Sequence, residues 1–111
     1  MILKRLRLGE IENVVRRYVK DGGRLPTPSE LCARHGFSEL EYVVWYSLFE
    51  ILADCGLQDE TLTSDDILQF RFELDPERKT FTTYLRDRKL CTANVKNASP
   101  QFWAEAGEQT S

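Results

Sequence analysis

The sequence predicts an α+β fold in one small domain, with three helices ahead of a β-hairpin. Apolar residues recur at spacings of three and four through the first half of the chain, and they alternate with polar residues over residues 68–74. With 111 residues, 41% of them hydrophobic, the chain has enough apolar surface for one modest core. We expect the domain to span residues 1–90 and a short C-terminal tail to span residues 91–111.

The first two helices are marked by apolar periodicity and by capping residues. Residues 8–21 place their apolar side chains on one stripe, and Gly22 follows where a C-terminal cap is needed. Residues 28–35 are expected to form a short helix with Thr27 as its N-cap. Glu30, three residues after that cap, completes the pattern of a capping box.

A third helix is expected over residues 39–55. Gly36 separates it from the second helix, and Ser38 with Glu41 forms a second capping-box pattern at its start. Apolar residues are so frequent here that the helix is predicted to be the central one of the fold.

A β-hairpin is expected next, with strands at about residues 67–74 and 79–86. Apolar and polar residues alternate in the first strand, and the second is rich in threonine and aromatic residues. The residues between them, 75–78, are typical of a turn, while a helix beginning at Asp75 is the alternative. In the tail, Phe102 and Trp103 either dock on the core or fray.

Charge is strongly segregated along the chain. The net charge is −3, yet residues 1–36 carry eight bases and four acids, whereas residues 37–69 carry eight acids and no base. Residues 70–90 are again basic, with six bases and four acids. Such a chain either presents a basic and an acidic surface to different partners or pairs the opposite charges internally.

The segment from Thr27 to Trp45 resembles the helix-turn-helix of bacterial and phage regulators. Its first half is similar to the stretch P-T-x-x-E-L-A-x-x-x-G-x-S found in the third region of bacterial sigma factors, with Leu31 facing inward, Gly36 at the turn and Ser38 as the cap. The resemblance implies a helix-turn-helix core that includes the preceding helix. The hairpin would then stand where a winged helix has its wing.

A helix-turn-helix reads DNA with arginine, lysine, asparagine or glutamine on the outer face of its second helix. Here that face is expected to carry glutamates and aliphatic residues, which makes it a poor reader of bases. Either basic residues elsewhere contact phosphates, or the helix is buried under a protein partner or in a dimer. The candidate nucleic-acid-binding residues are Lys4, Arg5, Arg7, Arg16, Arg17, Lys20, Arg24, Arg78 and Lys79, and the candidate protein-interface residues are Glu39, Leu40, Val43 and Val44.

Two non-catalytic functions stay open. The first is a regulator associated with DNA or with a protein of the transcription machinery. The second is an adaptor or inhibitor of the phage or plasmid type, in which the helix-turn-helix is a scaffold for protein binding. No apolar run approaches the roughly 20 residues of a membrane span, and the start lacks the apolar core of a secretory signal, so we expect no membrane partner. Three cysteines in no C-x-x-C pattern indicate a reducing compartment, so we expect a cytoplasmic protein. No small-molecule substrate is expected.

The three cysteines and the single histidine are candidate metal ligands. Cys32, Cys55 and Cys91 are odd in number and form no C-x-x-C pattern, which favours reduced thiols over a disulfide framework. With His35 they would make the kind of set that binds zinc. Burial of Cys32 and His35 in the core is the preferred explanation, and no cofactor or catalytic arrangement is expected.

Overall fold

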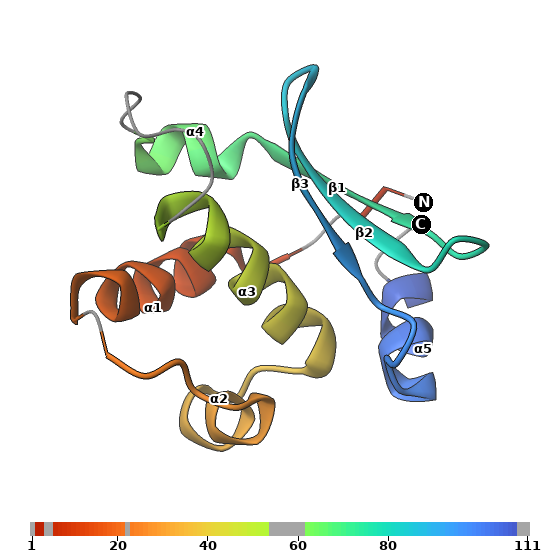
Figure 1. Cartoon of the computed structure of the whole chain (residues 1–111), viewed down its shortest axis with the longest axis horizontal. Helices are drawn as coiled ribbons and strands as arrows, with labels where there is room; N and C mark the ends of the chain where they lie inside the picture. The colour runs from red at the N-terminus through yellow and green to blue at the C-terminus, as the bar shows by residue number, and fades with distance from the viewer. Residues whose placement is uncertain (1, 4–5, 22, 54–61, 109–111) are drawn as a thin grey trace.

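The computed structural model describes residues 2–3, 6–21, 23–53 and 62–108. Within these ranges the fold is α+β, with five helices and one three-stranded antiparallel sheet (Figure 1). None of the helices in this part of the chain is both long enough and apolar enough to cross a bilayer. The elements are α1 (Leu8–Asp21), α2 (Pro28–His35), α3 (Glu39–Ala53), α4 (Ser64–Leu68), β1 (Phe70–Asp75), β2 (Thr80–Leu85), β3 (Arg88–Asn94) and α5 (Pro100–Glu108).

The first two helices have the predicted boundaries, because local caps define them. The Thr27 hydroxyl accepts a hydrogen bond from the Glu30 N–H at 3.2 Å, and Gly36 ends α2 with a left-handed φ of 69°. A side chain at that φ would be strained, so the glycine suits the turn into α3. The predicted end of α3 at residue 55 and the cap at Gly22 lie outside the described residues.

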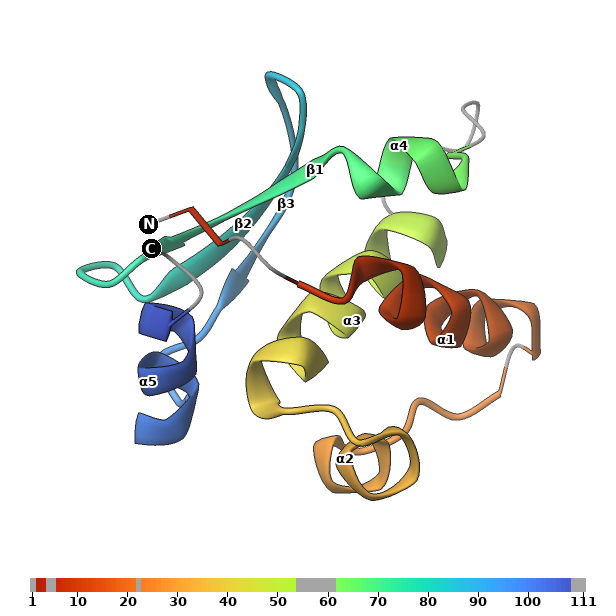
Figure 2. The same ribbon diagram turned by 180° about the vertical axis from the view of Figure 1, so that it is seen from behind.

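The core forms around α3, which lies between α1 and the sheet (Figures 1 and 2). Trp45 of α3 is fully buried and stands edge-on to Tyr18 of α1, with ring centroids 5.6 Å apart. From the sheet, Phe72 and Phe81 enter the same core with their rings 5.6 Å apart. Burial of these large side chains is the main favourable contribution to the stability of the fold.

The prediction of three helices before the hairpin was wrong, since α4 makes a fourth. Thr63 and Asp66 cap each other, with Thr63 N to Asp66 Oδ2 at 3.0 Å and Asp66 N to Thr63 Oγ1 at 3.2 Å. Ile67 is fully buried and anchors this turn to the core. A helix of five residues is too short to show apolar periodicity. The predicted strand therefore begins at residue 67, inside what is the end of α4.

The predicted hairpin is present as β1 and β2, and β3 extends it to a sheet of order β1-β2-β3. Phe72 pairs with Thr83 and Leu74 with Phe81, which sends the alternating apolar residues of β1 to the core. Asp75 Oδ1 accepts hydrogen bonds from the N–H groups of the second and third residues after it, at 3.0 and 3.1 Å. The turn therefore forms, and the alternative helix beginning at Asp75 does not.

Residues of the expected tail contribute to the sheet and to the core. The boundary at residue 90 falls inside β3, and α5 packs against α3 through Phe102, which is fully buried. The hydrophobic effect explains this packing, because Phe102 and Ala106 lie one helical turn apart and bury one face of α5. Figure 2 places α5 beside the sheet at the end where β1 turns into β2.

Candidate functional site

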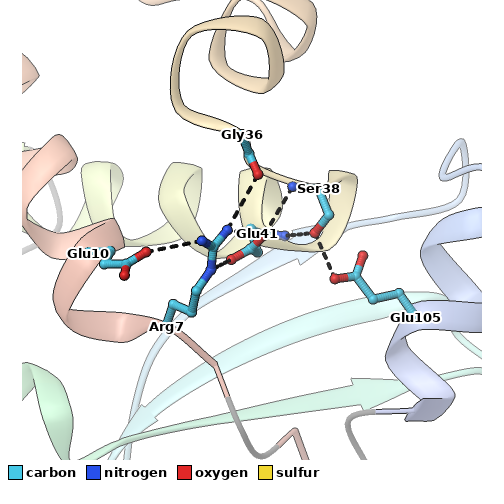
Figure 3. A network of polar contacts seen from close by, with 6 residues as sticks. All are labelled: Arg7, Glu10, Gly36, Ser38, Glu41 and Glu105. Carbon is cyan, nitrogen blue, oxygen red and sulfur yellow. Dashed lines mark hydrogen bonds and ion pairs between the residues drawn. The ribbon is translucent and has the colours of Figure 1, made fainter.

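The turn between α2 and α3 lies in a polar network that joins separate parts of the chain (Figure 3). Arg7, which precedes α1, donates to both carboxylate oxygens of Glu41, from Nε at 2.7 Å and from Nη2 at 2.8 Å. It also donates to the carbonyl of Gly36 at 3.4 Å. Ser38 and Glu41 form the predicted capping box, and the Ser38 hydroxyl donates to Glu105 of α5 at 2.7 Å. The start of α3 is therefore held by the N-terminal segment and by α5.

The electrostatics of this network favour the charged forms of both main partners. Burial by itself would raise the pKa of Glu41, but the hydrogen bonds from Arg7 and Ser38 outweigh it and the pKa is lowered. The hydrogen bond to Glu41 raises the pKa of Arg7 above its ordinary value. Glu41 is thus an ionised structural residue that faces inward.

Glu39, a predicted interface residue, is also used inside the chain. Its carboxylate accepts hydrogen bonds from the N–H of Ser99, at 3.0 Å, and from the Ser99 hydroxyl. Ser99 directly precedes α5, and its hydroxyl oxygen accepts the N–H of Phe102 at 3.4 Å. The start of α3 thus contacts the start of α5. In a helix-turn-helix protein, the N-terminal end of the second helix is the end that contacts DNA, and here α5 lies beside that end.

Two of the predicted protein-interface residues lie in the core. Leu40 and Val44 are both 0% exposed, so the prediction that they form an outer face of α3 was wrong. The outer face is instead formed by half-buried Tyr42, Val43 and Tyr46. Because α3 is apolar nearly all round, its sequence pattern does not distinguish the two faces.

This outer face of α3 lines a continuous groove. Two adjoining depressions, of about 350 and 660 Å³, share Tyr42, Val43, Asn94 and Val95 as lining residues. Each is many times the roughly 30 Å³ that one water occupies in the liquid, so side chains of a partner would fit. One end lies between α3 and the last residues of β3, and the other extends between α2 and α5. We call this depression the α3 groove.

Two tyrosines give the α3 groove a wall that is both apolar and polar. Tyr42 stacks on Trp45, with centroids 6.2 Å apart, and burial raises the pKa of its hydroxyl. The negative charge of Glu50, together with burial and a hydrogen bond to Glu50, raises the pKa of Tyr46. Both hydroxyls are therefore neutral donors at pH 7, next to rings that offer contact area.

Several of the predicted nucleic-acid-binding residues pair with carboxylates in the chain, as Arg7 does. Arg16 binds the buried Glu12 at 2.7 Å and donates to the carbonyl of Leu62 at 2.9 Å. Arg24 binds Glu30 at 3.0 Å. These contacts agree with the alternative that the opposite charges pair internally.

The remaining members of the predicted set do not gather on one surface. Arg17 and Lys20 are exposed on α1, whereas Arg78 and Lys79 lie in the turn between β1 and β2, on the opposite side of the molecule (Figure 1). Arg78 is 3.9 Å from Asp75 in that turn. Lys4 and Arg5 lie outside the described residues.

The suggested zinc ligands are separated in the fold. Cys32 is on α2, where it lines the α3 groove, Cys91 is on β3, and Cys55 lies outside the described residues. Burial, with the nearby charges of two arginines, lowers the pKa of His35 and keeps it neutral at pH 7. Its ring packs on Phe37, at a centroid distance of 5.7 Å. In the ranges that the structure describes, no group of three or more His, Cys, Asp or Glu side chains is arranged to hold a metal ion.

The part of the site that sequence reasoning missed lies after residue 90. Ser99-Pro100 has the same signature as Thr27-Pro28, an N-cap followed by proline at the first helical position, and this signal would have identified α5. The contact of Glu105 with Ser38 joins residues 67 positions apart, and no local pattern predicts it.

In comparisons with family models, curated proteins and solved structures, no match to this chain was found.

Proposed function

We propose that the protein is a non-catalytic adaptor or inhibitor that binds another protein through the α3 groove. In this proposal α2 and α3 are a helix-turn-helix-like scaffold, as the resemblance to regulators leads one to expect. The observation that carries the proposal is the groove itself, in which two tyrosines and Val43 are partly exposed on the central helix. Aromatic side chains with a polar tip are enriched in protein interfaces.

Charge along the α3 groove favours protein over nucleic acid as its ligand. Among the described residues that line it, Glu39, Glu50 and Glu105 are acidic, and none is lysine, arginine or histidine. DNA and RNA are bound chiefly through phosphates, which such a surface repels. The start of α3 is also covered by α5, which hinders its entry into a major groove.

A substitution in the α3 groove tests this function. Val43→Lys places a long charged side chain in the groove, and Val19→Lys is the matched control on half-buried α1 surface. Proteins captured from source cells by each variant are quantified, and the strongest is purified and titrated. We expect the wild type and Val19→Lys to bind it equally and Val43→Lys to lose at least tenfold in affinity. Equal binding by all three folded proteins contradicts the proposal.

A regulator associated with DNA or the transcription machinery is the second candidate, and one feature favours it. The turn between β2 and β3 projects from the body of the molecule, and it carries exposed Arg86, Arg88 and Lys89 (Figures 1 and 2). A projecting basic hairpin is suited to phosphate contact, as in the wing of a winged helix. This hairpin replaces the β1–β2 hairpin as the candidate wing.

Salt titration separates the two candidates. Binding to random-sequence duplex DNA and to single-stranded RNA is measured from about 50 mM salt upward. The adaptor function predicts no binding at the lowest salt. The second function predicts binding with a steep salt dependence. The slope of that dependence should fall by about one in Arg86→Gln and in Lys89→Gln, because each substitution removes a cation that binds one phosphate.

A further inference from the structure

The two edges of the sheet differ in whether another segment of the described chain pairs with them. At the outer edge of β1, the N–H of Leu3 donates to the carbonyl of Phe72 at 2.9 Å, and Ile2 bridges to Glu73. The N-terminal segment therefore covers that edge. At the other side of the sheet, β3 pairs with β2, and within the described chain no backbone hydrogen bond joins the outer edge of residues 92–94 to another segment.

The uncovered edge of β3 faces the α3 groove. Thr92, Ala93, Asn94 and Val95 all line it, although consecutive strand residues point to opposite faces of a sheet. A depression that touches four residues in a row runs along the backbone edge rather than over one face. At about 3.3 Å per residue, the three that belong to β3, Thr92 to Asn94, offer roughly 10 Å of edge.

Addition of a strand to an exposed sheet edge is a known mode of peptide binding. The peptide adds a strand to the sheet, its backbone groups pair with the edge, and alternate side chains enter the groove. Here those side chains would meet Tyr42, Val43 and Tyr46, which form the opposite wall. An uncovered edge also carries unpaired backbone groups, which an added strand satisfies.

Charge complementarity selects the kind of strand. The carboxylate of Glu50 stands at one end of the groove and that of Glu105 at the other, and no basic residue among the described ones lines it. A cationic segment is therefore attracted, and phosphate is repelled. A second copy of this chain, paired edge to edge, would bring two acidic grooves together, which disfavours a homodimer at this face.

We propose that the outer edge of β3 takes an extended, cationic segment of a partner protein as an additional strand. Apolar side chains at the alternate positions that enter the groove suit it, because they contact the tyrosines. Basic side chains at the two ends of the segment, on the same face as the apolar ones, reach the glutamates at the ends of the groove. This proposal rests on the adaptor function above, and it adds the backbone geometry and the charge of the segment that is bound.

The test uses two synthetic seven-residue peptides with the full-length protein. In both, valine at the third and fifth positions alternates with threonine, and the charged residue at the first and last positions, which lies on the same face as the valines, is lysine in one peptide and glutamate in the other. Binding is followed through the amide NMR signals of the protein. We expect the lysine peptide to bind and to shift the signals of residues 92–95, and the glutamate peptide not to bind. Methylation of alternate peptide nitrogens should abolish binding in one register and leave it in the other, since only one set faces the edge.

Two protein variants test the charge of the groove. Glu50→Gln should weaken binding of the lysine peptide roughly two- to fivefold, the effect of one exposed ion pair. Glu77→Gln, an exposed glutamate outside the groove, should leave the affinity unchanged. Failure of the lysine peptide to bind, shifts confined to another surface, or indifference to the register of methylation would overturn strand addition.

The outcome is separable from that of the adaptor function. A protein partner that depends on Val43, combined with a lysine peptide that does not bind, would leave the adaptor function standing and refute the strand. Register-dependent peptide binding without any Val43-dependent partner would support the edge and refute the adaptor. Self-association seen by light scattering and abolished in Val43→Lys would assign the groove to a second copy and refute the proposal.

Discussion

Replacing Glu41 with glutamine tests whether the Arg7–Glu41 pair holds the start of α3 in place. The substitution keeps the size of the side chain and leaves one oxygen to accept the N–H of Ser38, which Glu41 now binds at 3.1 Å. It removes the negative charge and turns an amide N–H₂ group towards a guanidinium that can only donate. The variant therefore isolates the charged hydrogen bonds from the helix cap.

The size of the effect follows from the exposure of the two partners. Hydrogen bonds to charged groups contribute about 1.5–3 kcal/mol. The Arg7 side chain is 47% exposed and can be hydrated again, whereas that of Glu41 is 11% exposed. We therefore expect a loss near the lower end, about 2 kcal/mol in the free energy of unfolding. With an unfolding entropy of about 2.1 cal/mol/K per residue, Tm should fall by about 9 °C.

Glu10→Gln is the matched control, because Glu10 binds the same arginine at 3.1 Å but its side chain is 66% exposed. An exposed pair contributes at most about 1 kcal/mol. Urea unfolding followed by circular dichroism at pH 7 measures both variants, and Arg7→Met completes the double-mutant cycle with Glu41→Gln. Equal losses in the two glutamine variants, or an unchanged free energy of unfolding in Glu41→Gln, would refute the reasoning.

Three further predictions concern stability and are measured by urea unfolding. The folded-state pKa of Glu41 lies below its unfolded value of about 4.3, so its contribution to stability is present above that pH and is lost as pH falls through the folded pKa. The free energy of unfolding of the wild type should therefore fall more steeply with decreasing pH than that of Glu41→Gln in this range. Parallel pH profiles would contradict this. Leu40→Ala should lower the free energy of unfolding by about 2–5 kcal/mol and Val43→Ala by about 1 kcal/mol or less, since Leu40 is buried and Val43 lines the groove. A larger loss in Val43→Ala than in Leu40→Ala would indicate that Leu40, and not Val43, lies on the outer face of α3. Phe102→Ala should cost about 3–5 kcal/mol, and a negligible loss would mean that α5 does not pack as described.

Much of the secondary structure was predictable because its signals are local. The bounds of α1 and α2 and the reciprocal contact of Ser38 with Glu41 follow from capping residues and periodicity within a few positions. The alternation that predicted a strand here likewise matches the burial of Phe70 and Phe72 in β1. By contrast, the three predicted helices do not include α4 and the predicted hairpin does not include β3, since one is a single short helix and the other has no fully buried side chain.

The candidate site was predicted less well, because it depends on contacts between distant segments. In the sequence, nothing distinguishes Arg7 and Arg16 from basic residues that bind a partner. Only the fold places them beside Glu41 and Glu12, with which they form ion pairs. The groove residues Tyr46 and Asn94 carry no motif, and they meet only because β3 lies against α3.

The sequence by itself determined an α+β domain with a capped helical pair and a following hairpin, because caps, turns and apolar periods act over a few residues. Only the tertiary structure decided which face of α3 is outside. The helix is apolar nearly all round, so its orientation depends on which neighbours bury more surface. It packs against α1, β3 and α5, and Leu40 and Val44 lie in the buried core. Tyr42, Val43 and Tyr46 are left beside the edge of β3, and the groove results from this packing.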